Sequence, residues 1–145
     1  VVKDTSGLVN LPANCEVTAI DPTDGRSLNP GASTWPEPRG YRWADGNIRF
    51  TGMTTVLPPN SPSCTSPNNE FEGVYSAGSF HMGGAHVLMG DGAVVFMTDS
   101  VDAGSSQSPS IQLGNGTAGQ RSPYGLWGGL GTRASRESFE EMLSQ

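Results

Sequence analysis

Two histidines and two aspartates lie within one short, unusually hydrophobic part of the chain. His81, His86, Asp91 and Asp99 all fall in residues 79–100, SFHMGGAHVLMGDGAVVFMTDS. Imidazole nitrogens and carboxylate oxygens are ligands of transition metals, and serine with histidine and aspartate makes up a hydrolase triad. The stretch is therefore either a chemical site or a structural element that happens to carry titratable groups.

The spacing of these residues argues against both kinds of chemistry. His81 and His86 are five residues apart, so on one strand they would point to opposite faces, and the glycine pair between them indicates a turn. Ser79, His81 and Asp91 match a triad only by residue type, because the sequence has no Gly-x-Ser-x-Gly nucleophile elbow. We expect a non-catalytic chain without a transition-metal site.

Oxygen-rich loops suit a hard cation better than the histidines suit a transition metal. Asp99 and Asp102, in TDSVDAG directly after the hydrophobic run, are the candidate calcium ligands. The chain lacks the twelve-residue EF-hand pattern, and aspartates in turns commonly accept hydrogen bonds from their own backbone. Calcium stays an alternative, and no other cofactor is expected.

The tryptophans and two tyrosines raise a second binding hypothesis. Rings exposed together form a platform for sugars, whereas in a domain rich in glycine and proline they more often fill the core between loops. We favour the core interpretation and keep an envelope adhesin that recognises glycans or other polymers as the alternative. The rings are Trp35, Tyr41, Trp43, Tyr124 and Trp127.

The composition is that of one loop-rich domain. With 145 residues the chain suits a single domain over residues 1–145, and its 20 Gly and 11 Pro place much of it in turns and loops. The formal net charge of −6, without a run of Lys or Arg, excludes an electrostatic footprint for nucleic acid or an anionic membrane surface. No nucleic-acid partner is expected.

The two cysteines indicate the compartment. Cys15 and Cys64 are too far apart for the paired spacing of a zinc site, and the few lysines with many Ser, Thr and Asn favour an extracytoplasmic location. We expect the cysteines to pair, which would close a loop of about fifty residues and stabilise the fold by ~4 kcal/mol on chain-entropy grounds. Two free thiols are the alternative.

The expected secondary structure is mostly short strands. CEVTAI (15–20) and GVYSAGS (73–79) favour single strands, and YRWA (41–44) with IRFTGMTTVL (48–57) favours a hairpin. Residues 103–122 are polar and rich in glycine, which predicts a flexible loop. SFEEMLSQ, within residues 138–145, is typical of one short helix with a capping box.

The strongest hairpin signal lies in HVLMGDGAVVFM (86–97). Asp91-Gly92 favours a two-residue type I′ turn, which would pair Met89 with Val94 and Val87 with Phe96. Both faces of this hairpin are apolar, so both need cover, and no long amphipathic helix is predicted to supply the second cover. The faces would carry Val87, Met89, Val94 and Phe96 on one side, and His86, Leu88, Val95 and Met97 on the other.

Three sequence blocks resemble one bacterial family. HMGGAHVLMGDG places His81 nine residues before Asp91-Gly92, as in the H-X9-DG motif of a family whose members begin with a prepilin-type leader. RWADGNIRFTGMTTVLPPNSPSC (42–64) is similar to that family's central block, and LWGGLGTRAS (126–135) to its C-terminal segment. The blocks occur in the family's order and span most of residues 42–135.

The resemblance implies the C-terminal globular part of a type IV pilin-like or type II secretion pseudopilin-like protein. The implied fold is α+β, mostly β here, with a pilin-like antiparallel sheet, long loops and the N-terminal helix absent. That helix would anchor the full-length protein in the inner membrane and pack along the sheet. The chain starts without Met or a visible signal peptide, as expected of part of a longer protein.

The implied function is structural. We expect a non-catalytic subunit or accessory component of a surface filament or secretion apparatus, located in the periplasm or at the cell surface. Its partners would be other pilin-like subunits or its own N-terminal helix. Under this interpretation Asp91 and Gly92 form the turn of the central hairpin, and His81 hydrogen-bonds across the loop that precedes it.

Overall fold

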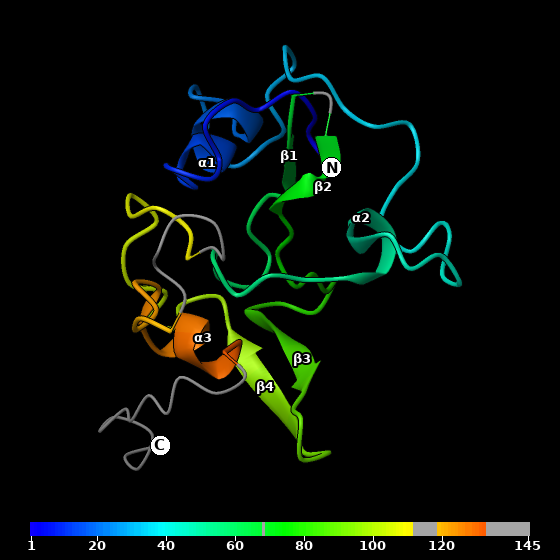
Figure 1. The fold of residues 1–145 in the computed structure, drawn as a ribbon. Coiled ribbons are helices and arrows are strands. Elements are labelled where there is room, and N and C mark those ends of the chain that lie inside the picture. Colours follow the sequence, from blue (N-terminus) through cyan, green and yellow to red (C-terminus); the bar gives the residue numbers. More distant parts are fainter. Residues whose placement is uncertain (68, 112–118, 133–145) are drawn as a thin grey trace.

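Short helices and strands separated by long loops make up the described part of the computed structural model, which covers residues 1–67, 69–111 and 119–132 (Figure 1). The strands form two antiparallel sheets of two strands each, β1 with β2 and β3 with β4. More of these residues lie in strands than in helices, which confirms the predicted α+β class. In chain order the elements are α1 (Asn14–Ala19), α2 (Ile48–Thr51), β1 (Cys64–Ser66), β2 (Asn69–Val74), β3 (Gly84–Leu88), β4 (Val94–Thr98) and α3 (Gly125–Leu130).

The buried side chains form two separate hydrophobic clusters. In Figure 1 the upper half holds α1, β1 and β2, and the lower half holds the hairpin β3–β4 and α3. Cys15 and Cys64 belong to the upper cluster and form a disulfide, with their Cα atoms 5.5 Å apart. The upper cluster is Val2, Leu8, Cys15, Ala19, Leu57, Cys64 and Val74, and the lower cluster is Ala77, Ala85, Val87 and Trp127.

The strand predicted for residues 15–20 is wrong, because residues 15–19 belong to helix α1 and Ile20 forms only an isolated bridge with Leu28. The buried residues of α1 are Cys15 and Ala19, four positions apart, whereas Val17 between them is exposed. Side chains four apart share one face of a helix, so this burial fits a helix docked by its disulfide. Six residues are too few for hydrophobic spacing alone to separate a helix from a strand.

The hairpin predicted for residues 41–57 is also wrong. Residues 41–44 form a turn, and helix α2 begins at Ile48, after residues 45–47. The Asp45 carboxylate accepts a hydrogen bond from the Asn47 N–H (3.0 Å), and the Asn47 side chain accepts one from the Arg49 N–H (2.9 Å). These side chains satisfy the free N–H groups of a helix start, so the Asp-Gly-Asn sequence initiates a helix instead of reversing a strand.

The upper sheet pairs β1 with β2 next to the disulfide. Cys64 lies opposite Val74, and Thr65 lies opposite Gly73. Of the strand predicted over residues 73–79, only the first two residues belong to β2.

The central hairpin lies where the sequence predicts it, but its register differs by one residue. Leu88 pairs with Val94, and His86 pairs with Phe96. The strands are joined by a three-residue loop, residues 90–92, closed by a hydrogen bond from the Met89 N–H to the Ala93 carbonyl (2.8 Å). Gly92 has a φ of 91°, the left-handed conformation typical of a three-residue hairpin loop with a bulge.

The register decides which residues share a face. Because side chains alternate along a strand, a shift of one residue turns β4 over relative to the prediction. One face carries Ala85 and Val87 of β3, and it packs on Trp127 of α3 with Leu130 at its margin. Helix α3 therefore covers the β3 part of this face, a cover that the sequence did not predict, while Val95 of β4 on the same face is 39% exposed.

The segment expected to be a flexible loop contains no helix or strand in residues 103–111 and 119–122. Its first part is hydrogen-bonded to distant residues, since Ser110 donates to the Val9 carbonyl (2.7 Å) and Ala13 donates to the Ser106 carbonyl (3.0 Å). The flexibility stays a prediction. The helix expected in residues 138–145 lies outside the described residues. In the described part of the chain, no helix combines the length and apolar character that crossing a bilayer requires.

Candidate interaction surface

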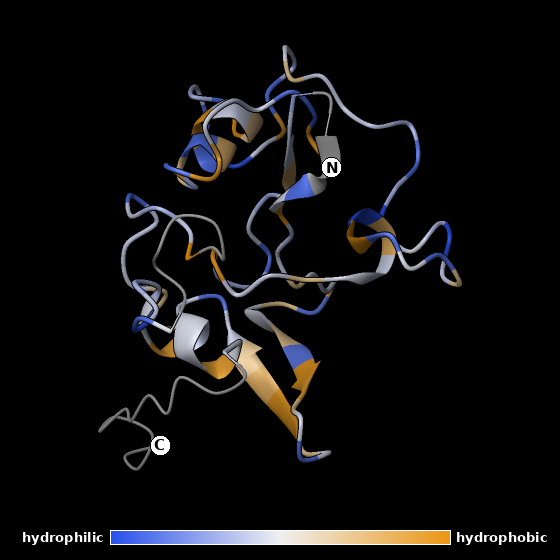
Figure 2. Cartoon of the chain, in the orientation of Figure 1, coloured by the Kyte–Doolittle hydropathy of each residue, from blue (hydrophilic) through white to orange (hydrophobic). Residues whose placement is uncertain are grey.

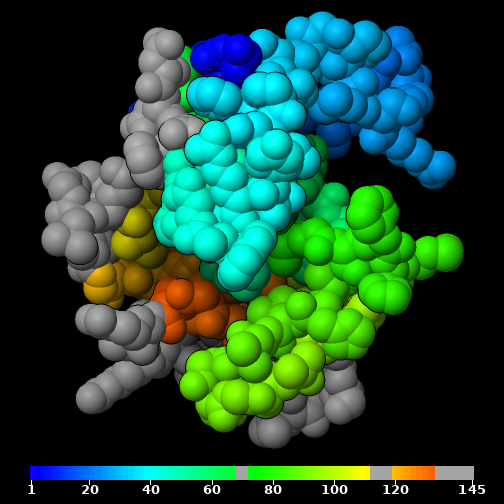
Figure 3. Space-filling view, turned by 90° about the vertical axis from the view of Figure 1, so that its right-hand side faces the viewer, coloured from blue at the N-terminus to red at the C-terminus, as the bar shows by residue number. Residues whose placement is uncertain are grey.

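The hairpin face turned away from α3 is apolar and exposed. Figure 2 shows hydrophobic residues along β4 and at the loop end of β3, and Figure 3 shows the hairpin and the turn before it together at the lower right of the molecule. Two fully exposed apolar side chains, Phe80 and Met82, extend from that turn. We define the outer hairpin surface as Phe80, His81, Met82, His86, Leu88, Val94 and Phe96.

Asn60 holds the turn that carries part of this surface. Its side-chain carbonyl accepts a hydrogen bond from the Ser79 N–H (2.8 Å), and its amide donates to the Asp99 carboxylate (2.8 Å). Ser79 in turn accepts a hydrogen bond from the His81 N–H (3.1 Å). Asn60 has a φ of 61°, which asparagine tolerates better than most residues. It thus ties the turn before β3 to Asp99, the residue directly after β4.

The two imidazole rings pack against each other and have no polar partner among the described residues. The rings of His81 and His86 lie edge to face, with centroids 6.4 Å apart, and the His86 ring lies 5.1 Å from that of Phe96. Both histidines are exposed. The hydrogen bond expected from His81 across the preceding loop is not found among the described residues.

The structure does not assemble the triad residues. Asp91 lies in the loop at the far end of the hairpin, separated from His81 by the whole of β3, and its carboxylate accepts a hydrogen bond from the Ala93 N–H (2.9 Å). The Ser79 hydroxyl is bonded to the backbone of His81 and not to a ring nitrogen. Of the motif residues, Asp91 and Gly92 shape the loop between the strands.

The candidate calcium ligands each serve a structural hydrogen bond. Asp99 accepts from the Asn60 amide, and Asp102 accepts from the Gly104 N–H (2.9 Å) and, at the start of α3, from the Leu126 N–H (3.4 Å). No group of three or more His, Cys, Asp or Glu side chains suited to a metal ion occurs in the described part of the chain. The two aspartates thus fix the ends of the hairpin and helix that frame the lower core.

The aromatic residues divide between core and surface. Trp127 and Tyr124 are buried, and the Trp35 indole donates a hydrogen bond to the Thr65 hydroxyl (3.0 Å). Trp43 and Tyr41 are instead 82% and 64% exposed. The core interpretation therefore fits the first group, whereas the last two rings are free to contact a ligand.

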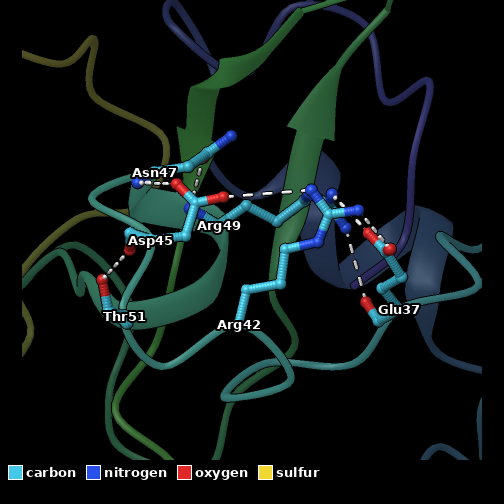
Figure 4. Close-up of polar contacts among 6 residues, drawn as sticks. All are labelled: Glu37, Arg42, Asp45, Asn47, Arg49 and Thr51. Carbon is cyan, nitrogen blue, oxygen red and sulfur yellow. Dashed lines mark hydrogen bonds and ion pairs between the residues drawn. The ribbon is translucent and has the colours of Figure 1, made fainter.

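An ion-pair network fixes the loop that presents these two rings (Figure 4). Glu37 contacts Arg42 at 2.6 Å and Arg49 at 3.2 Å. The Arg49 side chain is only 5% exposed, and its guanidinium lies 4.1 Å from the centre of the Phe50 ring. Hydrogen bonding from Arg42 and then Arg49 lowers the pKa of Glu37, and the same contact with Glu37 raises the pKa of Arg42.

The sequence did not predict this network, because only the fold brings its residues together. Glu37 lies 12 residues before Arg49, in a proline-rich loop whose path the sequence does not specify. The one available signal is the concentration of Arg and aromatic residues in residues 35–50, which is typical of cation–π stacking.

A hollow of about 490 Å³ lies between β4 and α3. Its walls are largely apolar, from Met89, Val95 and Met97 on the hairpin and from Leu126 and Leu130 on α3. The same residues border the lower core, and no histidine or cysteine lines the hollow. It offers largely apolar space next to the hairpin.

The part of the chain that matches a sequence family contains both cysteines of the disulfide and the whole hairpin. A family model described as "protein of unknown function (DUF1559)" matches residues 4–104, more than two thirds of the chain. The chain belongs to the DUF1559 family. DUF1559 is associated with prepilin-like and pseudopilin proteins, and helix α3 lies beyond the matched residues. Comparison with curated proteins and with solved structures finds no match.

Proposed function

We propose that this DUF1559 protein is a structural, non-catalytic component of the cell envelope. More specifically, it acts as a pilin-like or pseudopilin-like subunit or accessory component of a surface filament or secretion apparatus. The observation that carries this proposal is the outer hairpin surface, because a two-stranded sheet with one face on α3 and an apolar face in solvent is built to pack against something else. Membership of the DUF1559 family supports the same function.

The proposed partners are other pilin-like subunits or an N-terminal helix of the full-length protein, which would anchor it in the membrane. The outer hairpin surface has no Lys, Arg, Asp or Glu, so it suits an apolar partner. The H-X9-DG motif contributes Asp91 and Gly92, whose loop sets the register that brings Leu88, Val94 and Phe96 to this surface. The disulfide supports an extracytoplasmic location.

Fractionation of the native host tests this function. The full-length protein, detected with an antibody, should occur in the envelope and in the material sheared from the cell surface, with Cys15 and Cys64 oxidised. Replacing Leu88 by Glu should reduce its amount in the sheared material. Val17→Glu, at an equally exposed position on α1, should not. A protein found in the cytoplasm with free thiols would contradict the proposal.

Glycan binding is the second candidate function, favoured by the exposure of Trp43 and Tyr41 on a loop that Glu37 fixes through Arg42. A rigid loop loses little entropy when a sugar stacks on its rings. In a polysaccharide pull-down, Trp43→Ala should abolish capture while Val17→Ala leaves it intact. Absence of capture by the unchanged chain would remove this candidate.

A further inference from the structure

Both histidines of the chain lie in the outer hairpin surface. They come from different segments, His81 from the turn before β3 and His86 from β3 itself, and their rings are in contact. Phe96 of β4 packs against the second ring. Every imidazole of this protein is therefore placed within a group of exposed apolar side chains.

The size of this surface suits a protein contact. Phe80 and Met82 are fully exposed, and Leu88, Val94 and Phe96 are partly exposed. At roughly 150 Å² for a large apolar side chain, their exposed parts amount to on the order of 600 Å². Monomeric proteins rarely expose a larger apolar patch, and a standard interface buries about 800 Å² on each partner. The surface therefore supplies most of the area that one side of a stable dimer needs.

The charge of the chain is compatible with a second copy as the occupant. The chain carries a net charge of −6, and the outer hairpin surface contains no acidic or basic residue. The net charge opposes self-association, but salt screens charges more than about 10 Å apart, and a contact through this surface places no like charges against each other. An anionic membrane is a poor partner for the same acidic chain, because no run of Lys or Arg offsets the repulsion.

We propose that the outer hairpin surface joins two copies of this chain, packed face to face about a two-fold axis, and that protonation of His81 and His86 opens the contact. This inference adds to the proposed function a partner for the outer hairpin surface and a way in which the contact is regulated. It rests on the proposed function only for its biological setting. An isologous contact places four imidazoles in one apolar interface. Their protonation would bury positive charge without partners, which strongly disfavours the closed form.

The groups around the imidazoles do not neutralise that charge. The acidic residues on the adjoining segments are Asp91 in the loop between the strands and Asp99 after β4. Asp91 accepts the Ala93 N–H, and Asp99 accepts the Asn60 amide. In residues 1–67, 69–111 and 119–132, no carboxylate lies within ion-pair distance of either histidine.

Analytical ultracentrifugation at neutral pH over a range of chain concentrations tests the contact. The unchanged chain should show a monomer–dimer equilibrium. Leu88→Glu should weaken association at least about tenfold, the effect of removing one central contact at an interface. Val17→Glu is the matched control, since the two side chains are 71% and 77% exposed, and it should leave association unchanged. Circular dichroism verifies that both variants are folded.

Acidification tests the role of the histidines. Lowering the pH from about 7.5 to about 5.5, across the range in which imidazole ordinarily titrates, should dissociate the unchanged dimer. The double variant His81→Asn and His86→Asn, which stays neutral, should remain dimeric at both values. Acid dissociation of the double variant would overturn the histidine mechanism.

Other outcomes overturn the contact itself. A chain that is monomeric at every concentration at neutral pH excludes it, and so does equal weakening by Leu88→Glu and Val17→Glu. Association with phosphatidylcholine vesicles by a monomeric chain would assign the surface to a lipid instead. These results are independent of the fractionation test. Failure of the envelope location leaves a dimer in solution intact, and a monomer in solution leaves the envelope location intact.

Discussion

The indole Nε1 of Trp127 donates a hydrogen bond of 2.8 Å to the backbone carbonyl of Leu57. Leu57 belongs to the upper cluster and Trp127 to the lower one, and both are buried. The bond joins residues 70 positions apart, so it links the half of the molecule that holds the disulfide to the half that holds the hairpin. The Trp127 indole thus belongs to the lower cluster and also forms a polar link to the upper cluster.

Replacing Trp127 tests how strongly the halves depend on it. Trp127→Ala should lower the free energy of unfolding by about 3–5 kcal/mol, since it removes a fully buried aromatic ring. Trp127→Phe keeps much of the ring but leaves the Leu57 carbonyl without its donor, which costs about 1–3 kcal/mol. Urea denaturation followed by circular dichroism measures both. Trp43→Ala, at an exposed ring, should change stability by less than about 0.5 kcal/mol, and a loss equal to that of Trp127→Ala would contradict the assignment.

Breaking the disulfide should destabilise mainly through the unfolded chain. The bridge closes a loop with a sequence separation of 49, and its removal should cost about 2–4 kcal/mol by restoring freedom to the unfolded state. Thermal unfolding with and without a reducing agent measures this. The double variant Cys15→Ala and Cys64→Ala should be insensitive to the reductant. An unchanged melting temperature on reduction of the native chain would contradict the prediction.

Acid should weaken the loop network of Glu37. Because Arg42 and Arg49 lower the pKa of Glu37, the folded chain favours the carboxylate more strongly than the unfolded chain does. This stabilisation is complete above the ordinary glutamate value of about 4.3 and is lost as the pH falls through the lower folded pKa. Glu37→Gln removes it, so the difference in unfolding free energy between the two proteins should shrink below about pH 4. A difference that is constant from neutral to acidic pH would show that the charge is not involved.

The hairpin loop should depend on the left-handed backbone of Gly92. At φ 91° an alanine is strained, and a Cβ at this position would meet no atom within 4 Å, so the cost is that of the backbone alone. We expect Gly92→Ala to destabilise by about 1–2 kcal/mol in urea denaturation. Gly90→Ala is the control, because a Cβ there also meets nothing within 4 Å and its φ lies outside the left-handed region. Equal effects of the two variants would contradict the loop geometry.

The elements that the sequence predicted well are those with a strong local signal. The hairpin of β3 and β4 follows from two apolar runs around Asp91-Gly92. Its register was missed by one residue, because Asp-Gly suits both a two-residue turn and the three-residue loop that forms. Helix α1 was missed because its burial pattern depends on a disulfide to a residue 49 positions away. Helix α2 was missed because Asn47 acts as a cap.

The candidate site was predictable in kind but not in detail. Two apolar faces on one hairpin indicated that some face would lack cover, and the outer hairpin surface is that face. Which residues lie on it depends on the register, so Val94 and Phe96 share it with Leu88 and not with Val87. The link from Asn60 to Asp99 spans 39 residues and had no signal in the sequence beyond the presence of an asparagine in a loop.

The position of the disulfide has a mechanical consequence. If the chain is pulled from its two ends, the force passes through the Cys15–Cys64 bridge and bypasses the residues between them. Those residues could otherwise extend to roughly 160 Å, whereas the bridge holds its two Cα atoms 5.5 Å apart. Tension would therefore lengthen the segments outside the bridge, including the hairpin, while α2 and the loop of Trp43 lie on a closed ring that carries no load.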